Sequence, residues 1–365
     1  MLNSGGGAID VDTGQALTLS GQIAGTGNLS KTGDGILVMA GANTYAGTTT
    51  VDSGVLLIQN LQALGSTSGQ TVVSSNGTLR LQDDITIGGE PLTLNGSGAS
   101  GSTGALHSSS GANTWTGDVT LATSSTVGVD NGTRSLSGVV DGPGSLIKKG
   151  TGTLVISGNN TYSGGTNVEV GTIQVSSAVH LGSGTLLLDG GVVNSTATFT
   201  DNRAVTENSS GGTLDVDAAT TWTLSGLVSG SGGLTKTGLG TLVLTGGNSY
   251  SGGTTVSEGI LPGDANGLQG NISNSASVVF DTAGAGTYAA VVSGTGNLVK
   301  TGPAPLSLSG DNTYTGTTTI HGGALRVEGS DERIVDQSDV AVNTPGVFDL
   351  NNFTKRLTFC PATAR

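Results

Sequence analysis

Carboxylates and histidines are the side chains of this sequence that could do acid–base or metal chemistry, and they are sparse. Asp83 and Asp84 form the tightest acidic pair. Adjacent residues on a strand point to opposite faces, so we expect this pair to lie in a turn. Asp215 and Asp217 are spaced to share one strand face and to approach one ligand, although a solvated face is the favoured interpretation.

The remaining candidates for chemistry are three histidines and one cysteine. His107, His180 and His321 are scattered among glycine and serine, and we expect each to be a surface turn residue rather than a ligand or a base. Cys360 has no catalytic partner near it in the sequence. Calcium-binding Gly-Gly-x-Gly-x-Asp repeats, a Gly-Asp-Ser-Gly motif and a Gly-Lys-Ser/Thr phosphate loop are all missing. The sequence therefore predicts no catalytic, cofactor-binding or metal-binding residue, no cofactor, and no enzyme.

Composition narrows the class of protein further. The formal net charge of −13 repels phosphate backbones, so a nucleic-acid partner is not expected. One cysteine cannot form an internal disulfide. No apolar run is long enough for a membrane-spanning helix. Residues 1–7 lack the pattern of a signal peptide, so in an exported protein the signal would lie elsewhere.

The elements that would carry any site are short strands between glycine-rich turns. In residues 150–175, Leu154 and Ile156 alternate with Val155, and Ser157 and Gly158 then begin a turn. Side chains two apart share one face of a strand, so each strand has one apolar face. Aromatic residues make up only 3% of the chain, which favours a narrow aliphatic core over a bulky globular one.

An internal repeat decides the fold prediction. Four segments align, at residues 17–58, 136–175, 224–261 and 289–327, and a decayed copy near 111–121 places Trp115 where the others have tyrosine. In each of the four a lysine precedes a tyrosine by 14 residues, in the pairs Lys31 and Tyr45, Lys148 and Tyr162, Lys236 and Tyr250, and Lys300 and Tyr314. A β-sandwich gives no reason for this constant offset, whereas a solenoid with coils of roughly 20–24 residues does.

The segments at residues 150–173 and 238–261 resemble the autotransporter-associated β-strand repeat, also called the passenger-associated transport repeat. The resemblance implies an all-β, right-handed parallel β-helix over residues 1–353, exposed at a bacterial cell surface. It also implies an outer-membrane β-barrel translocator as partner, which this chain does not contain, and a role in passenger export and stalk formation. Residues 354–365 depart from the pattern and become basic, and we expect them to be a disordered or truncated tail of a longer protein.

Three functions follow as hypotheses. The first is a non-catalytic stalk segment that supports export and surface display. The second is a surface adhesin that binds a host or matrix ligand, and the third, least favoured, is a polysaccharide-cleaving β-helix enzyme. The recurring tyrosines and lysines could form a ligand-binding ladder, but the preferred interpretation has tyrosine covering a corner and lysine discouraging edge pairing. Pro303 and Pro305 predict an altered corner in a fourth copy that survives.

Overall fold

The computed structural model describes residues 1–328, 334 and 338–351. The chain divides into an N-terminal unit, residues 1–187 and 191–193, and a C-terminal unit, residues 188–190 and 194–365. Its described elements are parallel β-strands and one short 3-10 helix, η1 (Ala178–Leu181). Strands β18 (Leu186–Leu188) and β19 (Val192–Ser195) contain residues of both units.

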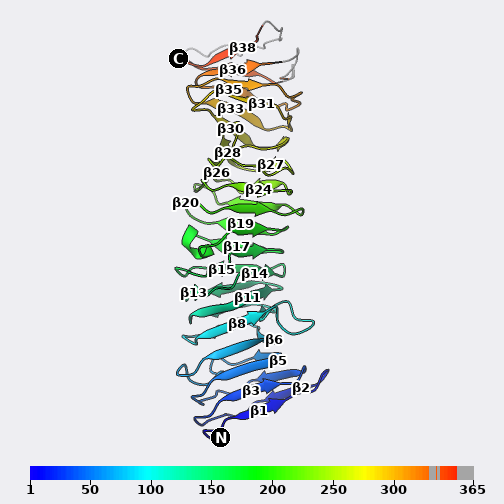
Figure 1. Ribbon diagram of the computed structural model, residues 1–365, viewed down its shortest axis with the longest axis vertical. Coiled ribbons are helices and arrows are strands. Elements are labelled where there is room, and N and C mark those ends of the chain that lie inside the picture. Colours follow the sequence, from blue (N-terminus) through cyan, green and yellow to red (C-terminus); the bar gives the residue numbers. More distant parts are fainter. Residues whose placement is uncertain (329–333, 335–337, 352–365) are drawn as a thin grey trace. The chain divides into compact units, whose positions relative to one another are not determined.

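In the N-terminal unit, successive turns of the chain pair in parallel (Figure 1). One sheet runs in the order β1 (Gly7–Asp10), β3 (Leu29–Thr32), β5 (Thr49–Ile58), β6 (Thr71–Leu81), β8 (Leu92–Gly96), β11 (Val119–Val129), β14 (Leu146–Lys149) and β16 (Thr166–Val168). It is joined at its margins by β2 (Ala16–Leu19), β4 (Ile36–Met39), β9 (Leu106–Ser108) and β13 (Val140–Asp141). A second sheet contains β7 (Thr86–Ile87), β10 (Ala112–Trp115), β12 (Thr133–Leu136), β15 (Thr153–Ile156) and β17 (Thr172–Val175).

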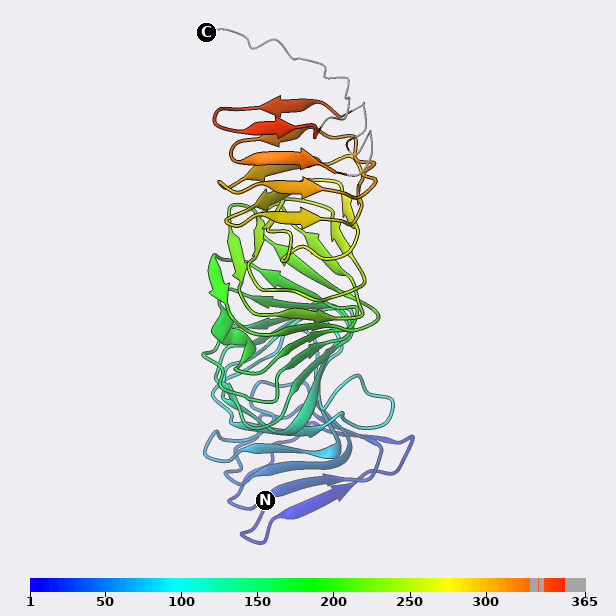
Figure 2. The ribbon, with the colours of Figure 1, turned by 45° about the horizontal axis from the view of Figure 1, so that its top comes forward.

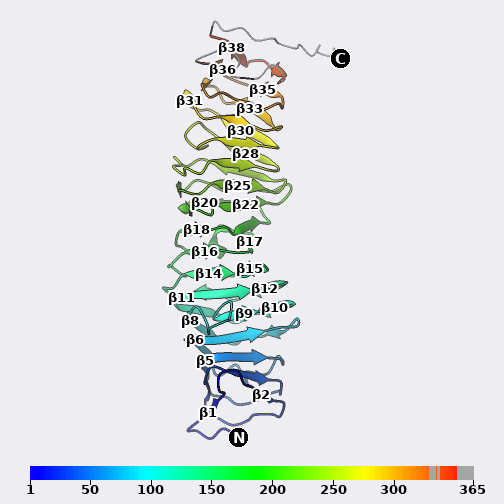
Figure 3. The same cartoon turned by 90° about the vertical axis from the view of Figure 1, so that its right-hand side faces the viewer.

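The C-terminal unit repeats the arrangement, and its strands form layers in Figures 2 and 3. Strands β21 (Val205–Glu207) and β24 (Val228–Gly230) pair on one side. A second sheet contains β22 (Gly212–Val216), β25 (Leu234–Thr237), β27 (Thr254–Val256), β29 (Ile272–Asn274) and β32 (Val292–Ser293). A third contains β20 (Phe199–Asp201), β23 (Thr221–Leu224), β26 (Thr241–Leu244), β28 (Ile260–Gly263), β30 (Ser277–Asp281), β33 (Asn297–Thr301), β35 (Thr318–Ile320) and β37 (Val340–Val342). The fourth contains β31 (Gly286–Tyr288), β34 (Leu306–Leu308), β36 (Ala324–Val327) and β38 (Val347–Asp349).

The strand register shows how one coil lies on the next. Arg134 pairs with Leu154, and Leu154 pairs with Ile173, so residues about 20 apart in sequence are neighbours. Leu154, Ile156 and Ile173 are buried, as the alternation of apolar residues requires. Each unit is thus a parallel β-solenoid, and the fold predicted from the repeat is confirmed.

Two proline-containing segments tested the strand predictions. The fourth copy does survive Pro303 and Pro305, because β33 and β34 flank this corner and both pair with neighbouring coils. Pro262 lies within β28, opposite Val279 of β30. Proline lacks only the amide donor, so one strand can keep its pairing through the residues on either side.

Candidate functional site

The four repeat lysines are the most unusual side chains of the fold, because they are buried. Lys31 is 1% exposed, and Lys148, Lys236 and Lys300 are 0% exposed. The Lys148 ammonium donates to the carbonyls of Lys149 and Gly150, at 2.9 and 2.6 Å, and to that of Val170 in the next coil, at 3.1 Å. The predicted role of lysine in discouraging edge pairing is therefore wrong: each Nζ joins one coil to the next.

The same three-carbonyl arrangement recurs in the other copies. Lys31 donates to Thr32, Gly33 and Ser53, Lys236 to Thr237, Gly238 and Glu258, and Lys300 to Thr301, Gly302 and Gly322. Burial lowers the pKa of Lys148 and of Lys236 to about 8, so both remain charged at neutral pH. The carbonyl oxygens supply the partial negative charge that this buried ammonium needs.

An asparagine stands two residues before each tyrosine, and Asn43, Asn160 and Asn248 each link three successive coils. Asn160 Oδ1 accepts from the Val140 amide at 2.8 Å, and its Nδ2 donates to the His180 carbonyl at 2.5 Å. Asn43 and Asn248 bridge in the same way, with partners Ile23 and Ala63, and Val228 and Gly267. Asn312 accepts from the Val292 amide at 2.8 Å and donates to the Gly310 carbonyl at 3.1 Å. The role of these asparagines was not predicted from the sequence, although their fixed spacing from tyrosine was the available signal.

The tyrosines close the corners that they were expected to cover. Each phenol hydroxyl forms a hydrogen bond with the threonine four residues later, in the pairs Tyr45 and Thr49, Tyr162 and Thr166, Tyr250 and Thr254, and Tyr314 and Thr318. The distances between the two oxygens are 2.5, 2.6, 2.7 and 2.6 Å. Burial raises the pKa of Tyr45 to about 12. We call each set of lysine, asparagine, tyrosine and threonine a clamp.

Trp115 was expected at the tyrosine position and lies elsewhere in the coil. It is in β10, in register with Leu136, which is itself in register with Ile156. The tyrosine of that later coil, Tyr162, comes six residues after Ile156, so Trp115 belongs to a strand column and not to the corner. Its indole Nε1 donates to the Glu90 carbonyl at 2.9 Å.

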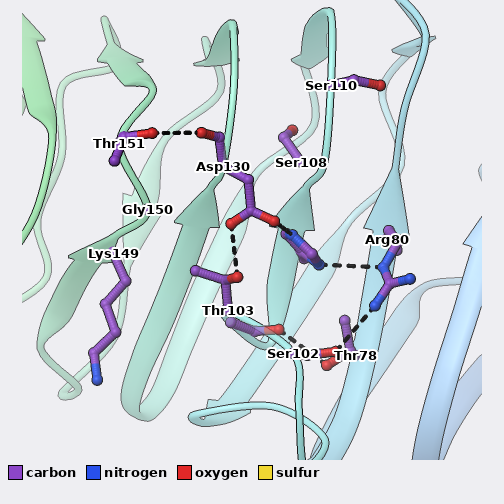
Figure 4. Close-up of polar contacts among 12 residues, drawn as sticks. Thr78, Arg80, Ser102, Thr103, Ser108, Ser110, Asp130, Lys149, Gly150 and Thr151 are labelled. Carbon is purple, nitrogen blue, oxygen red and sulfur yellow. Dashed lines mark hydrogen bonds and ion pairs between the residues drawn. The ribbon is translucent and has the colours of Figure 1, made fainter.

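His107 lies in a polar network of the N-terminal unit, with Arg80 and Asp130 as partners; Figure 4 shows these two residues. Arg80 Nε donates to His107 Nδ1 at 3.2 Å, and His107 Nε2 lies 2.6 Å from Asp130 Oδ2. Because an arginine nitrogen is always a donor, Nδ1 is the acceptor and Nε2 carries the proton given to Asp130. Burial is the largest cause that lowers the pKa of His107. Both ring nitrogens are thus engaged, and neither is left to take a proton from a substrate.

The same network holds down the loop before β9. Thr103 Oγ1 donates to Asp130 Oδ1 at 2.6 Å, and Arg80 Nη2 donates to Ser102 Oγ at 3.3 Å. Figure 4 shows Thr103 and Ser102 approaching Asp130 and Arg80 from this loop. The contacts tie the loop to the coils before and after its own, which is a structural task.

The prediction that all three histidines lie at the surface holds for one and is wrong for two. His107 and His180 are 4% and 7% exposed, so the expectation of surface residues is wrong for both. His180 Nδ1 accepts from the Ser176 amide at 3.2 Å. His321 is exposed, as expected. Cys360 and the tail of residues 354–365 lie outside the described residues.

The acidic pairs behave largely as the sequence indicated. Asp83 and Asp84 lie in a turn with φ of 63° and 64°, exposed, beside a pocket of about 570 Å³. Asp215 and Asp217 do converge, but on the Asn194 amide, which donates to both at 3.0 and 2.9 Å.

Among the described residues no group of three or more His, Cys, Asp or Glu side chains is arranged to hold a metal ion. That part of the chain also contains no helix that is both long and apolar enough to cross a membrane.

Comparison with known proteins identifies the clamped coils. The family model of the passenger-associated transport repeat matches residues 29–58, 146–175, 234–261 and 298–327. The chain carries four passenger-associated transport repeats. Each repeat contains one complete clamp, from its lysine to its threonine. The side chains that join coil to coil therefore recur in all four repeats.

Curated relatives carry similar sequence. The chain is 41% identical over 368 residues to the adhesin BmaC autotransporter of Brucella suis, an alignment that covers 89% of this chain and 10% of that protein. It is 45% identical over 60 residues to the autotransporter lipoprotein NalP of Neisseria meningitidis, covering 16% of this chain and 5% of the relative. The chain thus spans about a tenth or less of the length of these relatives. The search of solved structures gives no match.

Proposed function

We propose that this chain is a non-catalytic β-solenoid segment of an autotransporter passenger, carried at the bacterial surface, where it extends the protein and supports its export. The observation that carries this proposal is the clamp. Its lysine ammonium, asparagine amide and tyrosine hydroxyl all form hydrogen bonds with backbone or threonine groups. Asn43, Asn160 and Asn248 bridge the coils before and after their own. The recurring polar residues therefore stabilise stacking.

Stacking of this kind suits export through an outer-membrane translocator. Each coil supplies the strand edges and the carbonyl acceptors on which the next coil forms, so folding can proceed one coil at a time as the chain emerges. A clamp adds hydrogen bonds that exist only after two coils have met. The free energy released by each new coil favours movement of the chain outward.

Two neighbouring lysines provide the test, because Lys148 is buried and Lys149 is partly exposed. The chain is fused to an outer-membrane translocator without its own passenger, and surface-exposed protein is measured by labelling of intact cells. Lys148→Met removes the three carbonyl contacts, whereas Lys149→Met changes an exposed side chain whose ion pair with Glu169 spans 3.1 Å. We expect surface protein to fall several-fold for Lys148→Met alone. Equal display of both variants would contradict the proposal.

A second function, binding of a host or matrix ligand as an adhesin, is favoured by one surface of the C-terminal unit. Hydroxyl side chains stand in register on its outer face, in the order Thr213, Thr235, Thr255, Ser273 and Ser293. A groove of about 250 Å³ beside them is lined only by glycine, serine and threonine. Glycan and matrix arrays probed with wild type and with Thr235→Val/Thr255→Val test this function, and equal signals from both would exclude this surface.

A polysaccharide-cleaving activity remains the least supported function. His107 has both nitrogens engaged, and the Asp215 and Asp217 carboxylates are bonded to Asn194. Incubation with neutral and acidic polysaccharides, with and without calcium, is expected to release no product. Release of unsaturated or reducing ends would contradict the non-catalytic proposal.

A further inference from the structure

Arg134 is a wholly buried cation in the N-terminal unit. It lies in β12, is 0% exposed, and its Nε donates to the Ser108 hydroxyl oxygen at 2.8 Å. Its two terminal nitrogens, Nη1 and Nη2, are buried and have no hydrogen-bond partner among the described residues. Four N–H donors of one guanidinium therefore face the interior without a protein acceptor.

The surroundings of Arg134 are rich in donors and in positive charge. Asn113, the residue paired with Arg134 in the neighbouring coil, donates to the same Ser108 oxygen at 3.3 Å. Because the Ser108 oxygen accepts two N–H groups, the Ser108 hydroxyl proton remains available as a further donor. Ser108 and Asn113 are both 0% exposed.

No carboxylate among the described residues forms an ion pair with Arg134. Asp130, an acidic group of the same network, is bonded to His107 and Thr103. Arg80 and Arg134 both act to lower the pKa of His107, so two cations influence this region. Burial lowers the pKa of Arg134 itself to about 9, which leaves the guanidinium charged at neutral pH.

We propose that Arg134 and Ser108 enclose a small monovalent inorganic anion, chloride, in the interior of the N-terminal unit. A buried charge without a counter-charge is strongly unfavourable, and an anion supplies that charge. The planar guanidinium presents its donors in a fixed fork, which suits one acceptor held between Nη1 and Nη2. A water molecule would accept from these donors but would leave the charge unbalanced and would bring two protons of its own.

The buried positions of Arg134, Ser108 and Asn113 indicate when the ion binds. Asn113 and Arg134 come together only when β10 pairs with β12, so the ion is captured as these two coils stack. The bound anion then stabilises the stacked state by mass action. Stability of this region should depend on chloride concentration at constant ionic strength.

The first experiment measures hydrogen exchange of the full chain by mass spectrometry, in chloride replaced stepwise by gluconate, an anion too large for the site. Protection of peptides that cover residues 106–115 and 129–137 should rise up to about tenfold for each tenfold rise in chloride above the dissociation constant. Arg134→Met should be insensitive to chloride. Lys148→Met, which removes a buried cation already bonded to three carbonyls, should keep the wild-type chloride dependence.

The second experiment does not depend on a variant that folds. Crystals of the wild-type chain grown in sodium bromide should show an anomalous bromide peak within hydrogen-bond distance of Arg134 Nη1 and Nη2. Chloride-independent exchange in the wild type would overturn the proposal. So would a solvent peak at this position without anomalous signal, which would identify water.

Discussion

The ammonium of Lys148 and the α-carbon of Gly171 in the next coil lie against each other. A Cβ added to Gly171 would stand 2.8 Å from Lys148 Nζ and 2.3 Å from the Gly150 carbonyl oxygen. Gly171 also has a φ of 73°, which side chains disfavour. Gly259 stands in the same relationship to Lys236, with a corresponding distance of 2.9 Å. The backbone carbonyls of the preceding coil, beside which the clamp lysine lies, therefore require glycine at this corner.

Replacement of this glycine should be costly for two separable reasons. Gly171→Ala adds both a strained φ and a close contact, and we expect a loss of about 2–4 kcal/mol in the free energy of unfolding. Gly14→Ala is the matched control, because Gly14 has a φ of 76° with open space around its α-carbon. That variant should lose only about 1 kcal/mol. Urea denaturation followed by circular dichroism measures both, and equal losses would show that the close contacts at Gly171 carry no weight.

Removal of a bridging asparagine should uncouple three coils. Asn160→Ala leaves the Val140 amide and the His180 carbonyl buried without partners, at an expected cost of about 2–3 kcal/mol. The adjacent Asn159 is exposed, and Asn159→Ala should change stability by less than about 0.5 kcal/mol. Thermal unfolding of the two variants makes the comparison. A small effect of Asn160→Ala would mean that the bridge is dispensable.

Glu207 should make the C-terminal unit less stable as pH rises. It is 0% exposed, neither carboxylate oxygen has a partner among the described residues, and burial raises its pKa from 4.5 to about 8. Between these values the folded chain binds the proton and the unfolded chain releases it. The contribution of protonated Glu207 to stability is therefore fully present below about pH 4.5 and is lost progressively as pH rises to about 8.

The corresponding variant removes this dependence. Glu207→Gln cannot ionise and should be more stable than wild type by about 3 kcal/mol at pH 7, with little difference at pH 4. Urea unfolding at a series of pH values, followed by tryptophan fluorescence, tests this. A parallel profile for wild type and Glu207→Gln would contradict the assignment.

Release of the loop before β9 should be visible by proteolysis. Thr103→Val removes the 2.6 Å hydrogen bond to Asp130, so residues 97–104 should be cut several-fold faster by a nonspecific protease. Ser100→Ala changes an exposed residue at the tip of the same loop and should be cut at the wild-type rate. Mass spectrometry locates the cuts. Equal rates for the two variants would show that the network does not hold the loop.

Much of the architecture could be predicted because it depends on local pattern. The alternation of Leu154 and Ile156 with Val155 identifies a strand and its buried face, since strand geometry follows a period of two. The constant offset from Lys148 to Tyr162 identifies a repeat, and hence a solenoid. The turn at Asp83 and Asp84 follows from residue type and spacing in the same way.

The burial of charged and polar groups could not be predicted in this way. Lysine, arginine and histidine are mostly exposed in proteins, so His107, Arg134 and Lys148 were expected outside or were overlooked. Asn160 occupies a repeated position, but the sequence alone gave no role for it. For each of them the decisive partner lies in another coil, about 20 residues away in sequence.

The sequence by itself determined the strands and the repeat of this protein, because apolar alternation and glycine turns act over a few residues. Only the tertiary structure decided what the repeated polar residues do. The acceptors of Lys148 are backbone carbonyls, which every residue possesses and no sequence pattern marks. Stacking places the Val170 carbonyl over Lys148, and that placement turns a costly buried charge into a link between coils.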